Sequence, residues 1–193
     1  CQSLTQVSIL IPSSVTSIKC FAFTGCSSLT QILIPSSVTS IGDGAFSGCV
    51  KLAQITIPPS VTSIGNKAFV MCESLNQITI PSSLTSFGKN VFSMCKSLTQ
   101  IAIPSSLTSI RKYTFSYCSK LKQITIPSSV TLIERKAFYN CTALQQIIIP
   151  SSVTSIRHSA FRSCSLTEIT IPSSVTSIGN TVFYECLFLI KIS

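Results

Sequence analysis

The amino-acid sequence predicts a solenoid of about eight stacked coils, because one unit of 23 residues recurs along the whole 193-residue chain. The segment at 27–49, SSLTQILIPSSVTSIGDGAFSGC, returns at 96–118 as KSLTQIAIPSSLTSIRKYTFSYC. The proline that marks each unit stands at Pro12, Pro35, Pro58, Pro81, Pro104, Pro127, Pro150 and Pro172. A short, regular period is typical of repeat proteins, in which no unit buries its own apolar face and stacked neighbours supply the core.

The first part of the unit predicts a strand with one buried face. In TQILIP, Ile32 and Ile34 alternate with Gln31 and Leu33. This period of two is typical of a half-buried strand. Pro35 is expected to end the strand, because proline cannot donate to a sheet ladder and restricts the residue before it.

The rest of the unit predicts a second, shorter extended segment followed by a turn. VTSI at 38–41 is the extended segment, and GDGAFSGC at 42–49 is expected to form a turn or a short helical piece. Phe46 is the large side chain that fills the space between neighbouring coils. The columns expected inside the coil stay apolar or small in nearly every unit, and in one unit they are Leu29, Ile32, Ile34, Val38, Ile41, Ala45, Phe46 and Cys49.

This unit resembles the leucine-rich repeat of the BspA-like type, also called the Treponema pallidum type. Its pattern reads roughly C-x-x-L-x-x-I-x-I-P-x-x-V-x-x-I-G-x-x-A-F, and the match covers the whole chain. One unit satisfies every position through Cys49, Leu52, Ile55, Ile57, Pro58, Val61, Ile64, Gly65, Ala68 and Phe69. The departures replace the glycine, which indicates that a positive φ is not required there. They are Lys19, Arg111, Glu134 and Arg157.

The resemblance implies a leucine-rich-repeat solenoid with a parallel β-sheet on its inner face, and short strands, turns or short helical pieces elsewhere. It also implies a surface protein, from a bacterium or protist, that binds host proteins or matrix. Such a function follows from the family and not from the fold.

Residues 1–193 are expected to form a single domain that is a segment of a longer array without capping repeats. The chain begins at Cys1 with no initiator methionine, and LFLIKIS at 187–193 begins another strand and stops. Solenoids normally need polar caps, so open ends predict fraying or end-to-end self-association. No uninterrupted apolar run of about 18 residues occurs, which argues against a membrane span.

Nine of the ten cysteines occupy one column of the repeat. Stacked neighbours would lie about 4.8 Å apart with parallel side chains, which is poor geometry for a disulfide, and a linear column cannot surround a metal. We therefore expect buried, reduced thiols that fill the core and donate weakly to loop carbonyls, and no metal or cofactor. The column consists of Cys1, Cys26, Cys49, Cys72, Cys95, Cys118, Cys141, Cys164 and Cys186, and the remaining Cys20 is expected to be exposed.

Polar side chains alternate with the buried isoleucines of the first strand and form a candidate partner-binding face. One interpretation is a ladder of amides and hydroxyls that satisfy one another along the stack. The other is a flat face that binds a protein partner. Its candidate residues are Gln54, Thr56, Gln77, Thr79, Gln100, Ala102, Lys122, Gln123, Thr125, Gln146 and Ile148.

Basic side chains gather at the turn and form a candidate anion-binding ridge, hereafter the basic ridge. The net charge of +9 favours an acidic protein or an anionic glycan. A solvated ridge without a ligand is the alternative. Only Tyr113 is expected to lie close to the ridge, and this lack of interleaved aromatic residues argues against nucleic acid. The ridge consists of Lys89, Arg111, Lys112, Arg135, Lys136 and Arg157.

Catalysis finds little support, since the chain has one histidine and five scattered acidic residues. The sequence therefore predicts a non-enzymatic protein-binding repeat module, secreted or at the cell surface, that adheres to host or matrix proteins. The alternative is a structural or intracellular scaffolding array whose basic ridge docks an acidic partner.

Overall fold

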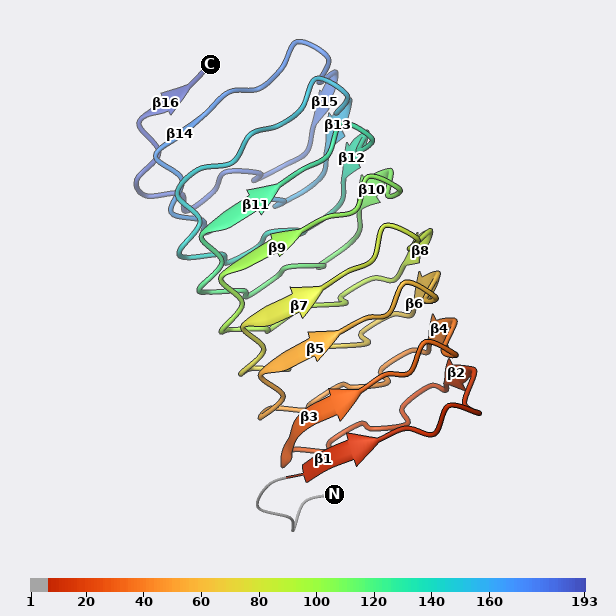
Figure 1. Cartoon of the computed structure of the whole chain (residues 1–193). Helices are drawn as coiled ribbons and strands as arrows, with labels where there is room; N and C mark the ends of the chain where they lie inside the picture. Colours follow the sequence, from red (N-terminus) through yellow and green to blue (C-terminus); the bar gives the residue numbers. More distant parts are fainter. Residues whose placement is uncertain (1–6) are drawn as a thin grey trace.

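Two parallel ladders of short strands run along the molecule, and nearly every coil contributes one strand to each (Figure 1). The coil that contains Pro150 contributes a strand to the second ladder only. This computed structural model describes residues 7–193. The strands of the first ladder are β1 (Val7–Leu10), β3 (Leu29–Leu33), β5 (Gln54–Thr56), β7 (Gln77–Thr79), β9 (Gln100–Ala102), β11 (Gln123–Thr125), β14 (Glu168–Ile169) and β16 (Lys191–Ile192). Those of the second ladder are β2 (Ser17–Ile18), β4 (Ser40–Ile41), β6 (Ser63–Ile64), β8 (Ser86–Phe87), β10 (Ser109–Ile110), β12 (Leu132–Ile133), β13 (Ser155–Ile156) and β15 (Ser177–Ile178).

The 23-residue period places equivalent residues of successive coils opposite one another. Gln54 pairs with Gln77 in the first ladder, and Ser40 pairs with Ser63 in the second. Strands of the first ladder pair two by two, as β1–β3, β5–β7, β9–β11 and β14–β16. The predicted leucine-rich-repeat solenoid is therefore confirmed. The short helical pieces that the sequence allowed do not occur in residues 7–193, where turns take their place.

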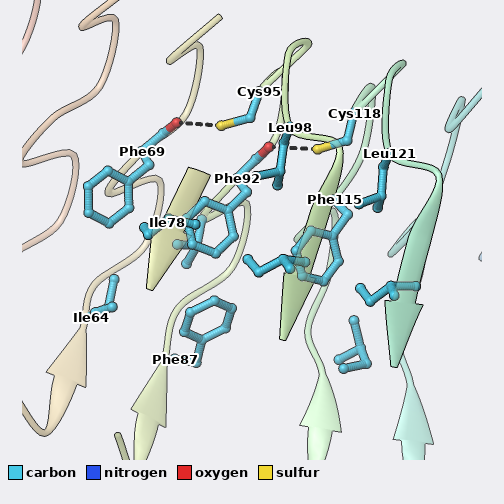
Figure 2. Close-up of a cluster of buried hydrophobic side chains, with 14 of the residues drawn as sticks. Ile64, Phe69, Ile78, Phe87, Phe92, Cys95, Leu98, Phe115, Cys118 and Leu121 are labelled. Carbon is cyan, nitrogen blue, oxygen red and sulfur yellow. Dashed lines mark hydrogen bonds between the residues drawn. The ribbon is translucent and has the colours of Figure 1, made fainter. Parts of the chain in front are cut away.

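Phenylalanine rings stack along the centre of the solenoid (Figure 2). Neighbouring rings have centroids 5.2–5.9 Å apart and planes inclined by 1–14°. The rings belong to Phe23, Phe46, Phe69, Phe92, Phe115, Phe138, Phe161 and Phe183. Every column that the sequence placed inside the coil is buried in the unit at 29–49, so the predicted core is confirmed.

The turn segment forms a third ladder of backbone hydrogen bonds. The amides of Gly44 and Phe46 donate to the carbonyls of Asn66 and Ala68 in the next coil, each over 2.8 Å. Positive φ values occur two residues after the column of Gly42, as at Gly44 with φ of 59°. The prediction that the Gly42 column itself needs no positive φ is confirmed. Gly42 instead approaches the preceding coil closely, since a Cβ there would lie 2.5 Å from an atom of the backbone.

The buried cysteines donate to carbonyls in the turn segment, as predicted. Each Sγ from Cys49 to Cys186 lies 3.1–3.2 Å from the backbone oxygen of a phenylalanine 25 or 26 residues earlier. Figure 2 shows two of these bonds, from Cys95 and Cys118. Burial raises the pKa of the Cys49 thiol to about 12. Cys20 is exposed, and Cys1 lies outside the described residues.

Candidate functional site

The candidate partner-binding residues lie on the outward face of the first ladder, hereafter the sheet face. All eleven side chains are exposed, while Ile55, Ile78, Ile101 and Ile124 between them point inward and are buried. This alternation follows from the pleat, which sends successive side chains to opposite faces.

Two adjoining shallow hollows lie over the sheet face. One, of about 300 Å³, is lined by the residues of β7, β9 and β11. The other, of about 640 Å³, extends from β11 to Ile148. Gln123 and Thr125 line both hollows, so the structure brings these candidate residues into one continuous surface.

The glutamines of the sheet face do not satisfy one another. Within residues 7–193, four glutamine side chains form no hydrogen bond to another protein group. They are those of Gln77, Gln100, Gln123 and Gln146. Ile148, beside them, is 84% exposed. The self-satisfied amide ladder is therefore not formed, and both the amides and an apolar side chain are free to contact a partner.

Besides the buried Ile124 and Ile147, two residues that line the larger hollow were not among the sequence candidates. Ala143 and Gln145 line it beside Gln146. They precede the strand segment of the repeat and lie outside its alternating pattern. Only the stacking of coils brings them to the edge of the sheet face.

The structure divides the basic ridge into free and engaged cations. Lys89, Lys112, Arg135 and Arg157 are exposed, and none of them forms an ion pair within residues 7–193. The first three lie in successive coils, where the amides of Lys67, Asn90 and Tyr113 donate to their carbonyls.

The other two ridge residues, Arg111 and Lys136, have partners on the protein. Nε of Arg111 lies 3.8 Å from Oε1 of Glu134. Nζ of Lys136 lies 4.9 Å from the ring centroid of Tyr139 and 5.7 Å from that of Tyr113. Such distances allow favourable cation–π attraction.

The expectation that only Tyr113 stands close to the ridge was wrong. Tyr139 packs edge-on against Tyr117, with centroids 5.2 Å apart. Arg162 lies 4.6 Å from the ring centroid of Tyr184 and 3.2 Å from a carboxylate oxygen of Glu185. These aromatic residues come from the outward columns of the turn segment, whose members differ in type from coil to coil and so show no periodic signal.

The acidic residues are spread over the surface, mostly beside cations. Glu73 pairs with Lys96 over 2.8 Å, and Glu134 and Glu185 lie beside arginines. Residues 7–193 contain no group of three or more His, Cys, Asp or Glu side chains arranged to hold a metal ion. Nor does this part of the chain contain a helix that is long and apolar enough to cross a membrane.

Stacked 23-residue coils, two parallel ladders and inward columns of leucine, isoleucine and phenylalanine define a leucine-rich-repeat protein. The chain belongs to the family described as the BspA type leucine rich repeat region, which matches residues 1–122 and 108–193 with six copies of the repeat.

Solved structures of leucine-rich repeat proteins are similar to this chain over 96% of its length. A leucine-rich cell surface protein of Faecalibacterium prausnitzii has 33% identity and a TM-score of 0.69, and the match covers 46% of that protein. The leucine-rich repeat protein of T. pallidum has 32% identity, a TM-score of 0.67 and 78% coverage. One from Bacteroides ovatus has 28% identity, a TM-score of 0.61 and 60% coverage.

The chain thus spans 60% or less of the length of the Bacteroides and Faecalibacterium relatives. No curated protein matches it.

Proposed function

We propose that this chain is a non-enzymatic protein-binding module and that the sheet face is its binding surface. The observation that carries the proposal is the set of unbonded glutamine amides beside the exposed Ile148 in the larger hollow. Protein interfaces combine an apolar centre with polar groups that find partners on the other protein. The sheet face offers both over successive coils.

Adhesion at the cell surface is the biological role that we propose for this binding. The proposal rests on the family, whose members are often surface-associated, and on the Faecalibacterium relative described as a cell surface protein. Host or matrix proteins are the corresponding partners.

Introducing lysine at Gln100, Gln123 and Gln146 is expected to weaken binding to the responsive member of a panel of matrix and cell-surface proteins by tenfold or more, roughly 1.4 kcal/mol or above. Three added charges would be desolvated at the interface without partners. Surface plasmon resonance against the panel measures the change.

Ser82, Ser105 and Ser128 provide the matched control, because they are exposed, lie in neighbouring coils and can receive the same three lysines away from the sheet face. The control variant should bind like the unmodified chain. Equal binding by both variants would place the contact surface elsewhere.

A second candidate function is docking of an acidic protein or anionic glycan by the basic ridge, in a structural array. The specific observation is that Lys89, Lys112 and Arg135 lie in successive coils, exposed and without ion pairs. Closely spaced like charges repel one another, and a bound polyanion would relieve this repulsion.

Reversing the charge of Lys89, Lys112 and Arg135 to glutamate is expected to abolish retention on immobilised heparin at about 0.15 M salt, where the Debye length is about 8 Å. Lys51, Lys120 and Lys191 are exposed elsewhere, and their reversal makes the same change in net charge. If both triple variants elute at the same salt concentration, retention reports only net charge and the ridge is not a site.

A further inference from the structure

The second ladder is interrupted between β8 and β10. At each other boundary from β2 to β15, the amide of a threonine donates to the threonine carbonyl of the preceding coil, as from Thr131 to Thr108 over 2.9 Å. Within residues 7–193, no such bond joins Thr108 to Thr85, and none joins the amide of Arg111 to the carbonyl of Phe87. No Cα atom of β8 lies within 8 Å of a Cα atom of β10 in this described region. Figure 1 shows the wider separation between these two strands.

Larger side chains in these two coils explain the interruption. Phe87 stands where every other coil has isoleucine, and Leu84 and Leu107 stand where the others have valine. The Phe87 ring packs against Phe92 with centroids 5.7 Å apart and planes inclined by 48° (Figure 2). Extra volume in a packed core forces the backbone apart.

The two coils remain joined on the side of the turn segment. The amides of Asn90 and Phe92 donate to the carbonyls of Lys112 and Thr114 over 2.9 and 3.0 Å. At the start of the two strands, the hydroxyl of Ser106 donates to the carbonyl of Leu84. The opening therefore lies between these two sets of contacts, along residues 85–89 and 107–111, where two strand edges face each other without backbone hydrogen bonds between them.

The opening is wider than normal strand spacing, since the Cα atoms of β8 and β10 are more than 8 Å apart, and its lining is mostly polar. Insertion of one strand requires about 9.6 Å between its neighbours, which is twice the normal spacing in a sheet. A groove of about 120 Å³ lies there, with the side chains of Phe87 and Leu107 in its lining. Its remaining lining consists of Thr85, Ser86, Ser106, Thr108, Ser109 and Arg111.

The charges around the groove favour an acidic ligand. Lys89 and Lys112 follow the groove-lining Phe87 and Arg111 closely in sequence, and both are exposed and without ion pairs in the described part of the chain. Arg111 lines the groove, and its buried Nε has no hydrogen-bond partner. Among residues 7–193, Glu134 is the one carboxylate within ion-pair distance of Arg111, at 3.8 Å.

We propose that the gap between β8 and β10 binds an extended, acidic segment of a partner protein, whose backbone pairs with the two open strand edges. Strand addition of this kind takes its affinity from main-chain hydrogen bonds and its specificity from side chains. Here the specificity comes from carboxylates that meet Lys89, Arg111 and Lys112. The site is on the second ladder, so it does not depend on the sheet-face proposal.

Residue-resolved amide hydrogen exchange of the full chain by NMR tests the proposal. The amides of Thr108 and Arg111 should exchange rapidly in the free protein, whereas those of Thr131 and Glu134, which donate to Thr108 and Ile110, should be protected. Adding the acetylated peptide EVTSIEE, an acidic version of the strand of this ladder, should slow exchange at Thr108 and Arg111 by about tenfold or more. The peptide KVTSIKK should not.

A variant carrying Leu84→Val, Phe87→Ile and Leu107→Val supplies the matched control. It restores the residues of the other coils, so it should fold, close the ladder and lose the response to EVTSIEE. Equal protection of Thr108 and Thr131 in the free chain would overturn the proposal, as would unchanged exchange with millimolar EVTSIEE or an equal response to KVTSIKK. Heparin retention should survive closure of the gap, because the variant keeps every cation of the basic ridge, and this result distinguishes strand addition in the gap from polyanion binding by the ridge.

Discussion

Replacing Phe115 with alanine is expected to lower the free energy of unfolding by about 3–5 kcal/mol. Phe115 is 1% exposed and stacks on Phe92 and Phe138, with centroids 5.9 and 5.5 Å away. A solenoid is stabilised by contacts between neighbouring coils, so the cavity weakens two interfaces in the middle of the stack. Urea denaturation followed by circular dichroism measures the loss.

Phe188→Ala is the matched control for this substitution. Phe188 is 61% exposed, so the same chemical change should alter the free energy of unfolding by about 0.5 kcal/mol or less. A loss below about 1 kcal/mol for Phe115→Ala would contradict the packing of the phenylalanine column.

Raising the pH from 8 to 10 in the presence of a reductant is expected to remove about 6 kcal/mol of stability. Burial raises the pKa of the thiols of Cys72, Cys95, Cys118 and Cys141 well above the ordinary value of 9.0. The folded chain therefore keeps protons that the unfolded chain releases. Their contribution is complete below about pH 9 and falls as the pH rises toward the pKa of the folded state.

The magnitude follows from the number of thiols. At one pH unit above the pKa of the unfolded thiol, each thiol that must stay protonated lowers the free energy of unfolding by about 1.4 kcal/mol. Four such thiols together approach the 5–15 kcal/mol that stabilises a typical domain. The free energy of unfolding in urea at pH 7, 9 and 10 measures the loss.

Cys20→Ser should leave this pH dependence unchanged, because Cys20 is exposed. A variant with alanine at Cys95 and Cys118 should start less stable but lose about 3 kcal/mol less over the same range. If the double variant and the unmodified chain show parallel pH profiles, the buried thiols do not control alkaline unfolding.

The candidate site could be predicted in part from the sequence. The exposure of Gln100 and Gln123 follows from their alternation with buried isoleucines. Whether their side-chain amides form hydrogen bonds with each other depends on side-chain positions, which an alignment of the repeats does not give. The same holds for Lys136, whose ring partner Tyr139 lies outside the basic column.

The sequence by itself determined the coil length, the two ladders and the columns that face inward. A nearly constant period of 23 residues leaves one way to bury Ile32, Phe46 and Cys49 and their equivalents, namely by stacking equivalent residues of successive coils. The end of the strand at Pro35 then follows, because proline has no amide hydrogen to donate to the ladder.

Only the tertiary structure decided where this regularity fails. The carbonyl that each cysteine contacts lies 25 or 26 residues earlier, and the positive φ falls two residues beyond the glycine column. Above all, Phe87 in place of isoleucine reads as a conservative change in the sequence. Its consequence for β8 and β10 depends on the volume left by Phe92 and Leu107 around it, and packed volume is a property of the assembled coils.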